Sequence, residues 1–230
     1  MPRTLLITDN EGCLTPGKGR AFDLEGLQAL ARALAANPEI KLTIATGRPA
    51  SYVEALLQAT GCMIDEPVIC EGGAVLYFPS TDRTELLGEP ADGPALMAEL
   101  NGVAYRLEPG KQCCVSFYPE GNATTAEIAR RLIEAGFGEK YTLLSSAAAV
   151  DVTPRGVDKA FGVDELRKRL LGSYDVFAGF GDSGNDGPLL RACDIAGCPS
   201  NATEEIRALS EFRSDHPHVW GLLAFIEHLS

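Results

Sequence analysis

Three short apolar segments of this chain each end at a residue that could do chemistry. Asp9 follows TLLIT, Thr46 follows KLTIA, and Asp182 ends the segment YDVFAGFGD. In open parallel sheets, ligand sites gather at the carboxyl ends of the strands. We therefore expect these three side chains to meet at one edge of a sheet.

Further charged residues lie close to these segments. Glu11 comes just after the first, Asp186 just after the third, and Lys159 stands at the start of a predicted helix. Several carboxylates at one edge would repel one another unless a cation sat among them. Hard oxygen ligands suit Mg²⁺, which keeps several waters and leaves positions for a substrate phosphate. A lysine and a hydroxyl beside that ion would complete a place for a phosphoryl group.

The segments that position these residues alternate between strand and helix patterns. Strands are expected at 4–8, 41–47 and 174–182, and helices with Leu and Ala at helical spacing lie between them and after them. Such alternation predicts an α/β fold with a parallel sheet covered by helices on both faces. Near the C-terminus, NATEEIRALSEF is expected to be one helix, followed by a closing helix.

The sequence changes character near residue 79. Residues 79–95 are rich in Pro, Gly, Asp and Glu and favour a loop or crossover, and then β-rich and helical segments follow as far as AAVDVTP. We expect a core domain formed by residues 1–78 and 152–230, and an inserted α/β domain formed by residues 79–151. Just before the insert, PVICEGGAVLYF is expected to form two short strands around its Gly-Gly turn.

The composition excludes several classes of function. A net charge of −12 argues against nucleic acid and anionic membranes as partners, because both need a basic footprint. No segment reaches the roughly 18 consecutive apolar residues of a membrane span. The N-terminus lacks the apolar stretch of a signal peptide, so we expect a cytoplasmic protein. The seven cysteines include no CxxC pair and are expected to be free, mostly buried thiols.

The motifs ITDNEG, TIATGRP, GVDKAFG and GFGDSGND occur in this order and together resemble the four motifs of the haloacid dehalogenase (HAD) superfamily. The resemblance implies a Rossmann-like core and an Mg²⁺-dependent phosphatase. It implies that Asp9 is the nucleophile that forms an aspartyl-phosphate, and that Glu11 is the general acid and base. The implied metal ligands are Asp9, Glu11 through its backbone carbonyl, Asp182, and Asp186 either directly or through water.

The same resemblance implies a phosphate site made by Thr46, the amide of Gly47, Lys159 and Asn185. Arg48, which follows this motif, either contacts the substrate or forms a surface ion pair. The insert lies between the second and third motifs, which resembles the type-2 cap of HAD subclass IIB. The short cap resembles the small phosphoglycolate phosphatases and the sucrose-phosphate phosphatase-like enzymes.

Hydrolysis of a small phosphorylated metabolite, phosphoglycolate or a sugar phosphate, is therefore the expected function. The sequence carries no signal for the oligomeric state. Two departures from the family pattern stand out: Glu11 replaces an Asp, and Gly72 replaces an Asn. Two alternatives stay open, phosphomutase-type transfer and a HAD-fold binding or regulatory protein with weak or lost hydrolysis because of Glu11.

Several other polar residues are expected to have ordinary roles. Lys18 and Lys111 are predicted to be solvated surface residues, and Glu71 to orient its own turn. His216 and His218 flank a proline without further obvious ligands, so structural or surface roles are expected for them.

Overall fold

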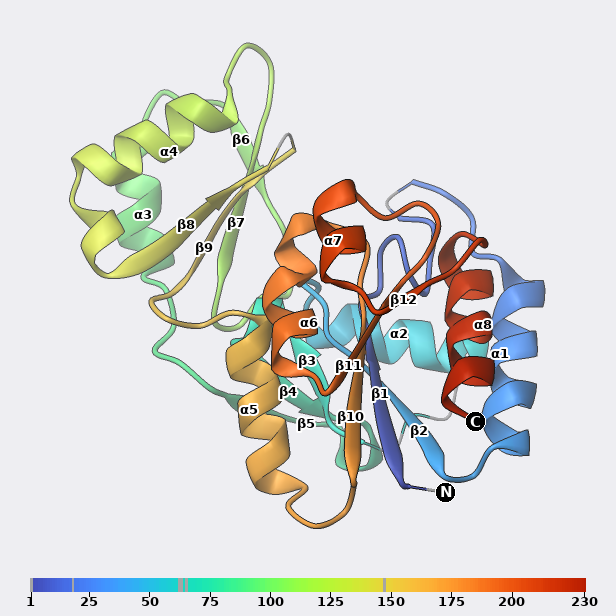
Figure 1. Cartoon of the computed structure of the whole chain (residues 1–230). Coiled ribbons are helices and arrows are strands. Elements are labelled where there is room, and N and C mark those ends of the chain that lie inside the picture. The colour runs from blue at the N-terminus through green and yellow to red at the C-terminus, as the bar shows by residue number, and fades with distance from the viewer. Residues whose placement is uncertain (1, 18, 62–63, 65, 147) are drawn as a thin grey trace.

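A parallel five-stranded sheet forms the core of the computed structural model, which describes residues 2–17, 19–61, 64, 66–146 and 148–230. Lys18 and Cys62 lie outside the described residues. The strand order is β12-β11-β10-β1-β2 (Figure 1), and all four strand pairs are parallel, as predicted. The strands are β1 (Thr4–Thr8), β2 (Ile40–Ile44), β10 (Val176–Phe180), β11 (Ile195–Cys198) and β12 (Phe212–Arg213).

Helices cover both faces of this sheet because the side chains of its strands alternate between them. Leu6 packs in one cluster with residues of α1, α2 and α8, whereas Leu5 and Ile7 pack in another with residues of α5 and α6. The helices of the core are α1 (Leu24–Ala36), α2 (Ala50–Thr60), α5 (Lys159–Arg169), α6 (Gly187–Ala192), α7 (Glu204–Leu209) and α8 (His218–Leu229).

The helix expected over NATEEIRALSEF is shorter than predicted. It forms only α7, and Ser210 then has an extended backbone with φ −94° and ψ 130°. Phe212 belongs to the edge strand β12, which pairs with β11, and its ring stacks on Phe225 of α8 at 5.2 Å. Packing of this aromatic ring and pairing with the sheet edge therefore override the helical pattern.

The two strands expected around the Gly-Gly turn are present as an antiparallel hairpin of β3 (Val68–Cys70) and β4 (Val75–Phe78). A third strand, β5 (Arg83–Leu86), pairs with β4. Its residues were expected to be part of a loop, and they carry the charged side chains typical of an edge strand. β3 touches the core sheet through a parallel bridge between Ile69 and Ala45.

The inserted segment forms a cap around an antiparallel sheet with strand order β6-β7-β9-β8 (Figure 1). Phe117, Val150 and Val152 point to one face, where α3 and α4 cover them in a separate hydrophobic cluster. The predicted domain boundary at 151/152 falls inside β9 and stays a prediction. The cap elements are α3 (Gly93–Glu99), β6 (Tyr105–Leu107), β7 (Val115–Pro119), α4 (Thr125–Glu134), β8 (Tyr141–Ser145) and β9 (Val150–Pro154).

Neither strand β6 nor helix α3 was predicted from the sequence. Helix α3 begins inside the stretch 79–95, which was expected to be irregular. Asp92 caps this helix by accepting a hydrogen bond from Ala95 N, and proline follows at the first turn.

Two general expectations can be compared with the fold. No helix within the described ranges combines the length and the hydropathy needed to cross a membrane. The six described cysteines are all free, and five of them are buried, as predicted.

Candidate active site

The carboxyl ends of three neighbouring strands bring the predicted residues to one edge of the sheet. β1 lies between β10 and β2, and its last residue is level with Phe180 and Ile44. Asp9 follows β1 directly, and its N–H donates to the carbonyl of Phe180 at 2.8 Å. Asp182 and Thr46 each come two residues after their strands end.

A buried lysine joins two of the carboxylates. Lys159 is the first residue of α5, and its neighbour Asp158 caps the helix by accepting from Phe161 N. The Nζ of Lys159 lies 2.6 Å from Asp9 Oδ1 and 2.6 Å from Asp186 Oδ1. All three side chains are nearly inaccessible to water, with exposed fractions of 3%, 7% and 0%.

Asp186 uses both of its oxygens inside the protein. Oδ1 accepts from Lys159, and Oδ2 accepts from the N–H groups of Asp182 and Ser183, both at 3.0 Å. Ser183 and Asp186 form a capping box at the start of the short turn η4 (Gly184–Asp186). Asp186 therefore holds Lys159 and the Asp182 loop in position.

Asp182 offers an oxygen that the protein leaves unused. Its Oδ1 is buried and has no hydrogen-bond partner among the residues that the structure describes. One oxygen each of Asp9 and Asp182 and the sulfur of Cys13 lie within 4.8 Å of one another. A buried, unpaired carboxylate oxygen is costly, and a divalent cation would satisfy it.

The donor set fits a hard cation such as Mg²⁺ better than a thiophilic one. Asp9 and Asp182 supply carboxylate oxygens, which Mg²⁺ prefers. Burial, reinforced by Asp9 and Asp186, raises the pKa of the Cys13 thiol well above its ordinary value. The thiol therefore stays protonated and leaves the carboxylates as the ligands of this cluster.

The electrostatics of the cluster also favour the binding of a cation. Burial, followed by the charge of Asp186, raises the pKa of Asp9 to about 8, although Lys159 opposes this shift. Burial and Asp186 likewise raise the pKa of Asp182 to about 6. Burial favours the neutral form of Lys159, but Asp186 and Asp9 outweigh it and raise its pKa. One ammonium thus faces three carboxyl groups.

Thr46 and Gly47 lie beside this cluster on the next strand exit. Thr46 is buried, and its Oγ1 accepts from Arg48 N at 3.1 Å. Gly47 is exposed, and an added Cβ there would meet no atom within 4 Å. Asn185 is exposed as well, and its Oδ1 accepts from the hydroxyl of Ser183. Gly47 and Asn185 are therefore accessible from solvent, whereas Thr46 is not.

Glu11 does not point at the buried cluster in the way that Asp9 does. Its Oε1 lies 2.8 Å from Arg48 Nη2. Arg48 also pairs through Nη1 with Glu108 Oε1 of the cap at 2.9 Å, and its guanidinium stacks on Tyr52 at 4.6 Å. Glu108 in turn accepts from the hydroxyl of Tyr118 at 2.6 Å. Arg48 is thus a link between the core and the cap, and of the two roles left open for it the ion pair is present.

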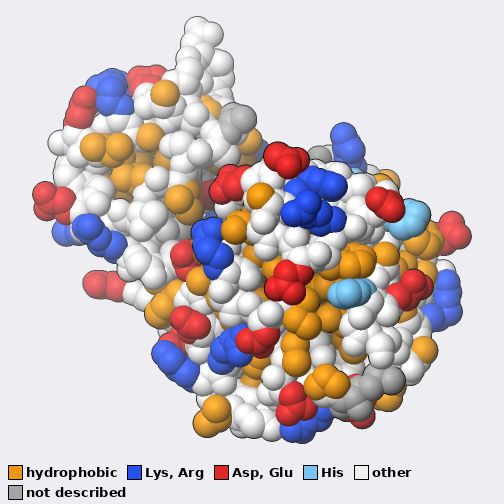
Figure 2. All heavy atoms as spheres, viewed as in Figure 1, with side chains coloured by type: hydrophobic (Ala, Val, Ile, Leu, Met, Phe, Trp, Pro, Cys, Tyr) orange, Lys and Arg blue, Asp and Glu red, His pale blue; other side chains and the backbone are white. Residues whose placement is uncertain are grey.

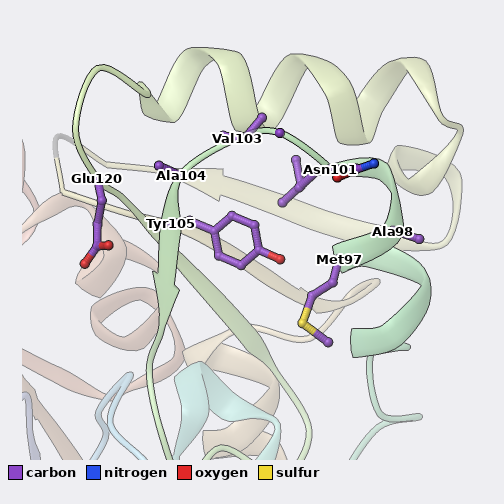
Figure 3. Close-up of a pocket in the computed structure, with 9 residues that line it drawn as sticks. Met97, Ala98, Asn101, Val103, Ala104, Tyr105 and Glu120 are labelled. Atoms are coloured by element: carbon purple, nitrogen blue, oxygen red, sulfur yellow. The ribbon is translucent and has the colours of Figure 1, made fainter.

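A crevice of about 350 Å³ opens at this link. Its walls come from the segment that leads into α2, from β6 and from the loop after β6, and they are Arg48, Pro49, Ser51, Tyr52, Arg106, Glu108 and Pro109. A second hollow lies wholly in the cap between α3 and β6 (Figure 3) and is lined by none of the predicted site residues. The crevice at Arg48 is therefore the better candidate for a substrate.

Side chains from the C-terminal part of the chain hold the loop that carries Glu11. The carbonyl of Gly12 accepts from Asn201 Nδ2 at 2.9 Å and lies 3.0 Å from His218 Nδ1. Gly12 has φ +96°, and a Cβ on it would lie 2.1 Å from Asp182 Oδ2. His218 therefore has the structural role expected for it, in support of the loop.

Three residues have roles that the sequence did not predict. Lys111, expected at the surface, has only 6% of its side chain exposed and lies 3.4 Å from Asp151 Oδ1. Glu71 reaches beyond its own turn into the cap, and Glu108 meets Arg48. The contacts of Glu71 and Glu108 join cap to core, whereas Lys111 contacts Asp151 within the cap. No local pattern in the sequence indicates any of these contacts.

The overall charge of the protein, −12, would not attract an anionic ligand to the site. The face in Figure 2 carries acidic and basic side chains interspersed, without one dominant basic patch. An anionic ligand would thus depend on local cations, namely Lys159 and the arginines of the crevice.

Comparison with known proteins gives a consistent picture. The profile of the family described as sucrose-6F-phosphate phosphohydrolase matches residues 2–222. A phosphoglycolate phosphatase of Methanopyrus kandleri is 27% identical over 98% of this chain and 97% of its own length. A phosphoglycolate phosphatase of Archaeoglobus fulgidus is 26% identical over 99% of this chain and 97% of its own length.

Solved structures agree on the fold. A Thermoplasma acidophilum protein superposes with a TM-score of 0.81 at 21% identity, over 99% of this chain and 98% of that one. The sucrose-phosphatase of Synechocystis, solved with sucrose and phosphate, has a TM-score of 0.75 at 21% identity and the same coverage. The chain therefore belongs to the sucrose-6F-phosphate phosphohydrolase family and is a phosphatase of HAD subclass IIB.

Proposed function

We propose that this protein hydrolyses the phosphomonoester of a small anionic metabolite, with phosphoglycolate as the first candidate, through an aspartyl-phosphate on Asp9. One observation carries the proposal: the buried Lys159 bridges Asp9 and Asp186 beside an unpaired oxygen of Asp182. The full-length similarity to archaeal phosphoglycolate phosphatases supports the choice of substrate. A sugar phosphate is the second candidate, because the family description names one.

Each residue of the buried cluster has a role in this proposal. Asp9 attacks phosphorus while its charge is shared with Lys159, and the alcohol leaves on the opposite side. Thr46, the Gly47 amide and Asn185 hold the phosphoryl oxygens. Mg²⁺, held by Asp9, Asp182 and the backbone carbonyl of Glu11, would neutralise charge on the phosphoryl group.

Of the two roles left open for Asp186, direct and water-mediated, its contacts favour the indirect one. Both of its oxygens are occupied by Lys159 and by backbone N–H groups. We therefore infer that Asp186 contributes to the metal site through water or through orientation of Asp182.

Glu11 is proposed as the acid that protonates the leaving oxygen and the base that then activates water. Its pairing with Arg48 means that it must turn, or that the substrate must enter between the two, before it can act. Glutamate is one methylene longer than the aspartate usual in the family. A displacement on that scale can lower the rate about 100-fold unless the loop compensates for it.

The direct test is release of inorganic phosphate from a panel containing phosphoglycolate, sucrose 6-phosphate and p-nitrophenyl phosphate, with Mg²⁺ or with EDTA. We expect Mg²⁺-dependent release, greatest with phosphoglycolate. Isomerised sugar phosphate with little free phosphate would instead identify a mutase. An inactive wild type that gains activity on Glu11→Asp would indicate a binding or regulatory role.

A further inference from the structure

The turn η1 (Glu71–Gly73) lies where three parts of the molecule meet. Glu71 N–H donates to the carbonyl of Arg48 at 3.0 Å, and Gly72 N–H donates to the carbonyl of Thr46 at 2.9 Å. A Cβ on Gly73 would lie 1.9 Å from the carbonyl oxygen of Asp158, next to the start of α5. The turn thus supports the Thr46 loop and touches the helix that carries Lys159.

The side chain of Glu71 leaves the core and binds the cap. Its Oε1 accepts from Gln112 N at 2.7 Å, and its Oε2 accepts from Cys113 N at 2.9 Å and Cys114 N at 2.8 Å. The residue is 2% exposed and has φ +50°, a conformation that a residue other than glycine rarely adopts. Three N–H groups around one carboxylate form a strong, charge-assisted contact.

The cap loop that Glu71 binds packs against the core domain. Cys113 and Cys114 are buried in the core hydrophobic cluster rather than in that of the cap. At the other end of the loop, a Cβ on Gly110 would lie 2.9 Å from Ser51 Oγ at the start of α2. The segment 108–114, which joins β6 to β7, therefore lies on the core over much of its length.

This loop also carries the partner of Arg48. Glu108 begins the segment and pairs with Arg48, whose other nitrogen pairs with Glu11. The backbone of Arg48 is bound by Glu71 N–H, and its side chain is bound by the loop that the Glu71 carboxylate holds.

We propose that Glu71 is a positioning residue: it pins cap loop 108–114 to the Thr46 loop, so that Glu108, Arg48 and Glu11 keep their relative places when the rest of the cap moves. The kinetic consequence rests on the proposed function, whereas the pinning itself does not. The Glu71 carboxylate bonds to the N–H groups of residues 112–114, which neither line the crevice nor belong to the buried carboxylate cluster, so the effect of its side chain on turnover is expected to pass through the loop.

The pin is tested by amide hydrogen exchange in Glu71→Gln. A neutral amide presents its own N–H groups to donors and cannot accept all three bonds. We expect exchange at residues 112–114 to become about 10-fold faster or more, as follows from losing a charged hydrogen bond. The matched control is Asp194→Asn. Asp194 also accepts a backbone hydrogen bond, from Phe177 N at 2.8 Å, but it lies at the amino ends of β10 and β11. Unchanged exchange at 112–114 in Glu71→Gln would overturn the proposal.

If Glu71→Gln does not fold, Glu71→Asp replaces it, because the shorter side chain keeps the charge but reaches fewer of the N–H groups. Faster exchange confined to residues 112–114 would support the pin, and wild-type exchange there would overturn it.

The consequence for turnover is tested by a double-mutant cycle of Glu71→Gln and Glu108→Gln with phosphoglycolate and Mg²⁺. We expect kcat/KM to fall about 10-fold in each single variant and by much less than the product in the double variant, since both act through one loop. Fully multiplicative losses would contradict a shared loop. Absence of phosphate release even from the wild type would count against the proposed function, while hydrogen exchange would still decide the pin.

Discussion

The floor and the rim of the candidate site are built in different ways. The floor consists of Asp9, Lys159 and Asp186, which are nearly inaccessible and joined at 2.6 Å. The rim consists of Glu11, Arg48 and Glu108, whose side chains are 32%, 16% and 10% exposed and come from loops of both domains. The sheet positions the floor, whereas the rim depends on how the cap lies on the core. Chemistry on phosphorus should therefore depend on the floor, and the fit of the leaving group on the rim.

Among the variants, Asp9→Asn should have the largest effect on phosphate release. It removes the proposed nucleophile, and we expect phosphate release to fall by at least about 1000-fold. Asp175→Asn, the same change at an exposed residue paired with Arg3, is the control and should keep wild-type activity. Turnover that survives in Asp9→Asn would mean that the floor does not carry the reaction.

Lys159→Met should reduce both activity and stability. It leaves Asp9 and Asp186 buried without their cation, and breaking such a pair costs about 3–5 kcal/mol. We expect phosphate release to fall by about 100-fold or more. Urea unfolding of the metal-free protein at pH 8 measures the stability. A Lys159→Met protein as stable as the wild type would show that Asp9 and Asp186 can stay buried together without the ammonium group.

The affinity for Mg²⁺ should depend on pH because protons compete for Asp9 and Asp182, the carboxylates that would hold it. The pKa values of Asp9 and Asp182 are raised to about 8 and about 6. From pH 8 to pH 6 we expect the apparent Kd for Mg²⁺ to rise by about 100-fold. Titration calorimetry with Mg²⁺ alone measures this, and a constant Kd would contradict it.

The same pKa shifts determine how the stability of the metal-free protein depends on pH. The folded protein binds these protons more tightly than the unfolded chain, where the pKa is 3.8. The stabilisation is full below that value and is lost as pH rises through about 6 and about 8. Added Mg²⁺ should therefore raise the Tm more at pH 8.5 than at pH 5.5.

Arg48→Lys should have the smallest effect and separates rim from floor. Lysine keeps the charge but cannot bind Glu11 and Glu108 through a planar fork. We expect kcat/KM for phosphoglycolate to fall by about 10-fold or less, with an unchanged Kd for Mg²⁺. A parallel loss of Mg²⁺ affinity would show that rim and floor are not independent.

The sequence predicts the core fold and the meeting of Asp9 with Asp182 because both follow from short-range rules. Asp9 and Asp182 follow apolar segments, and the parallel sheet brings the ends of those segments together. The pairing of Lys159 with Asp9 joins residues 150 positions apart, and it was expected only from the resemblance to a family.

The rest depends on contacts that no local pattern encodes. The contacts of Glu108 and Glu71 follow from how the cap lies on the core. The contact of Lys111 with Asp151 follows from packing within the cap. Strand β6 has only three residues, and β12 has two, so neither gives a clear periodic signal. β12 forms because Phe212 packs on Phe225, a contact that the helical pattern of its segment conceals.

Gly12 shows that a residue without a functional group can limit the tolerance of the whole centre to change. At this position even alanine would place a methyl group 2.1 Å from Asp182 Oδ2, on a backbone with φ +96°. Such a substitution would act as a wedge, displacing the carboxylate while every acid, base and cation stayed chemically intact. A survey of this protein restricted to polar side chains would therefore overlook one of its most sensitive positions.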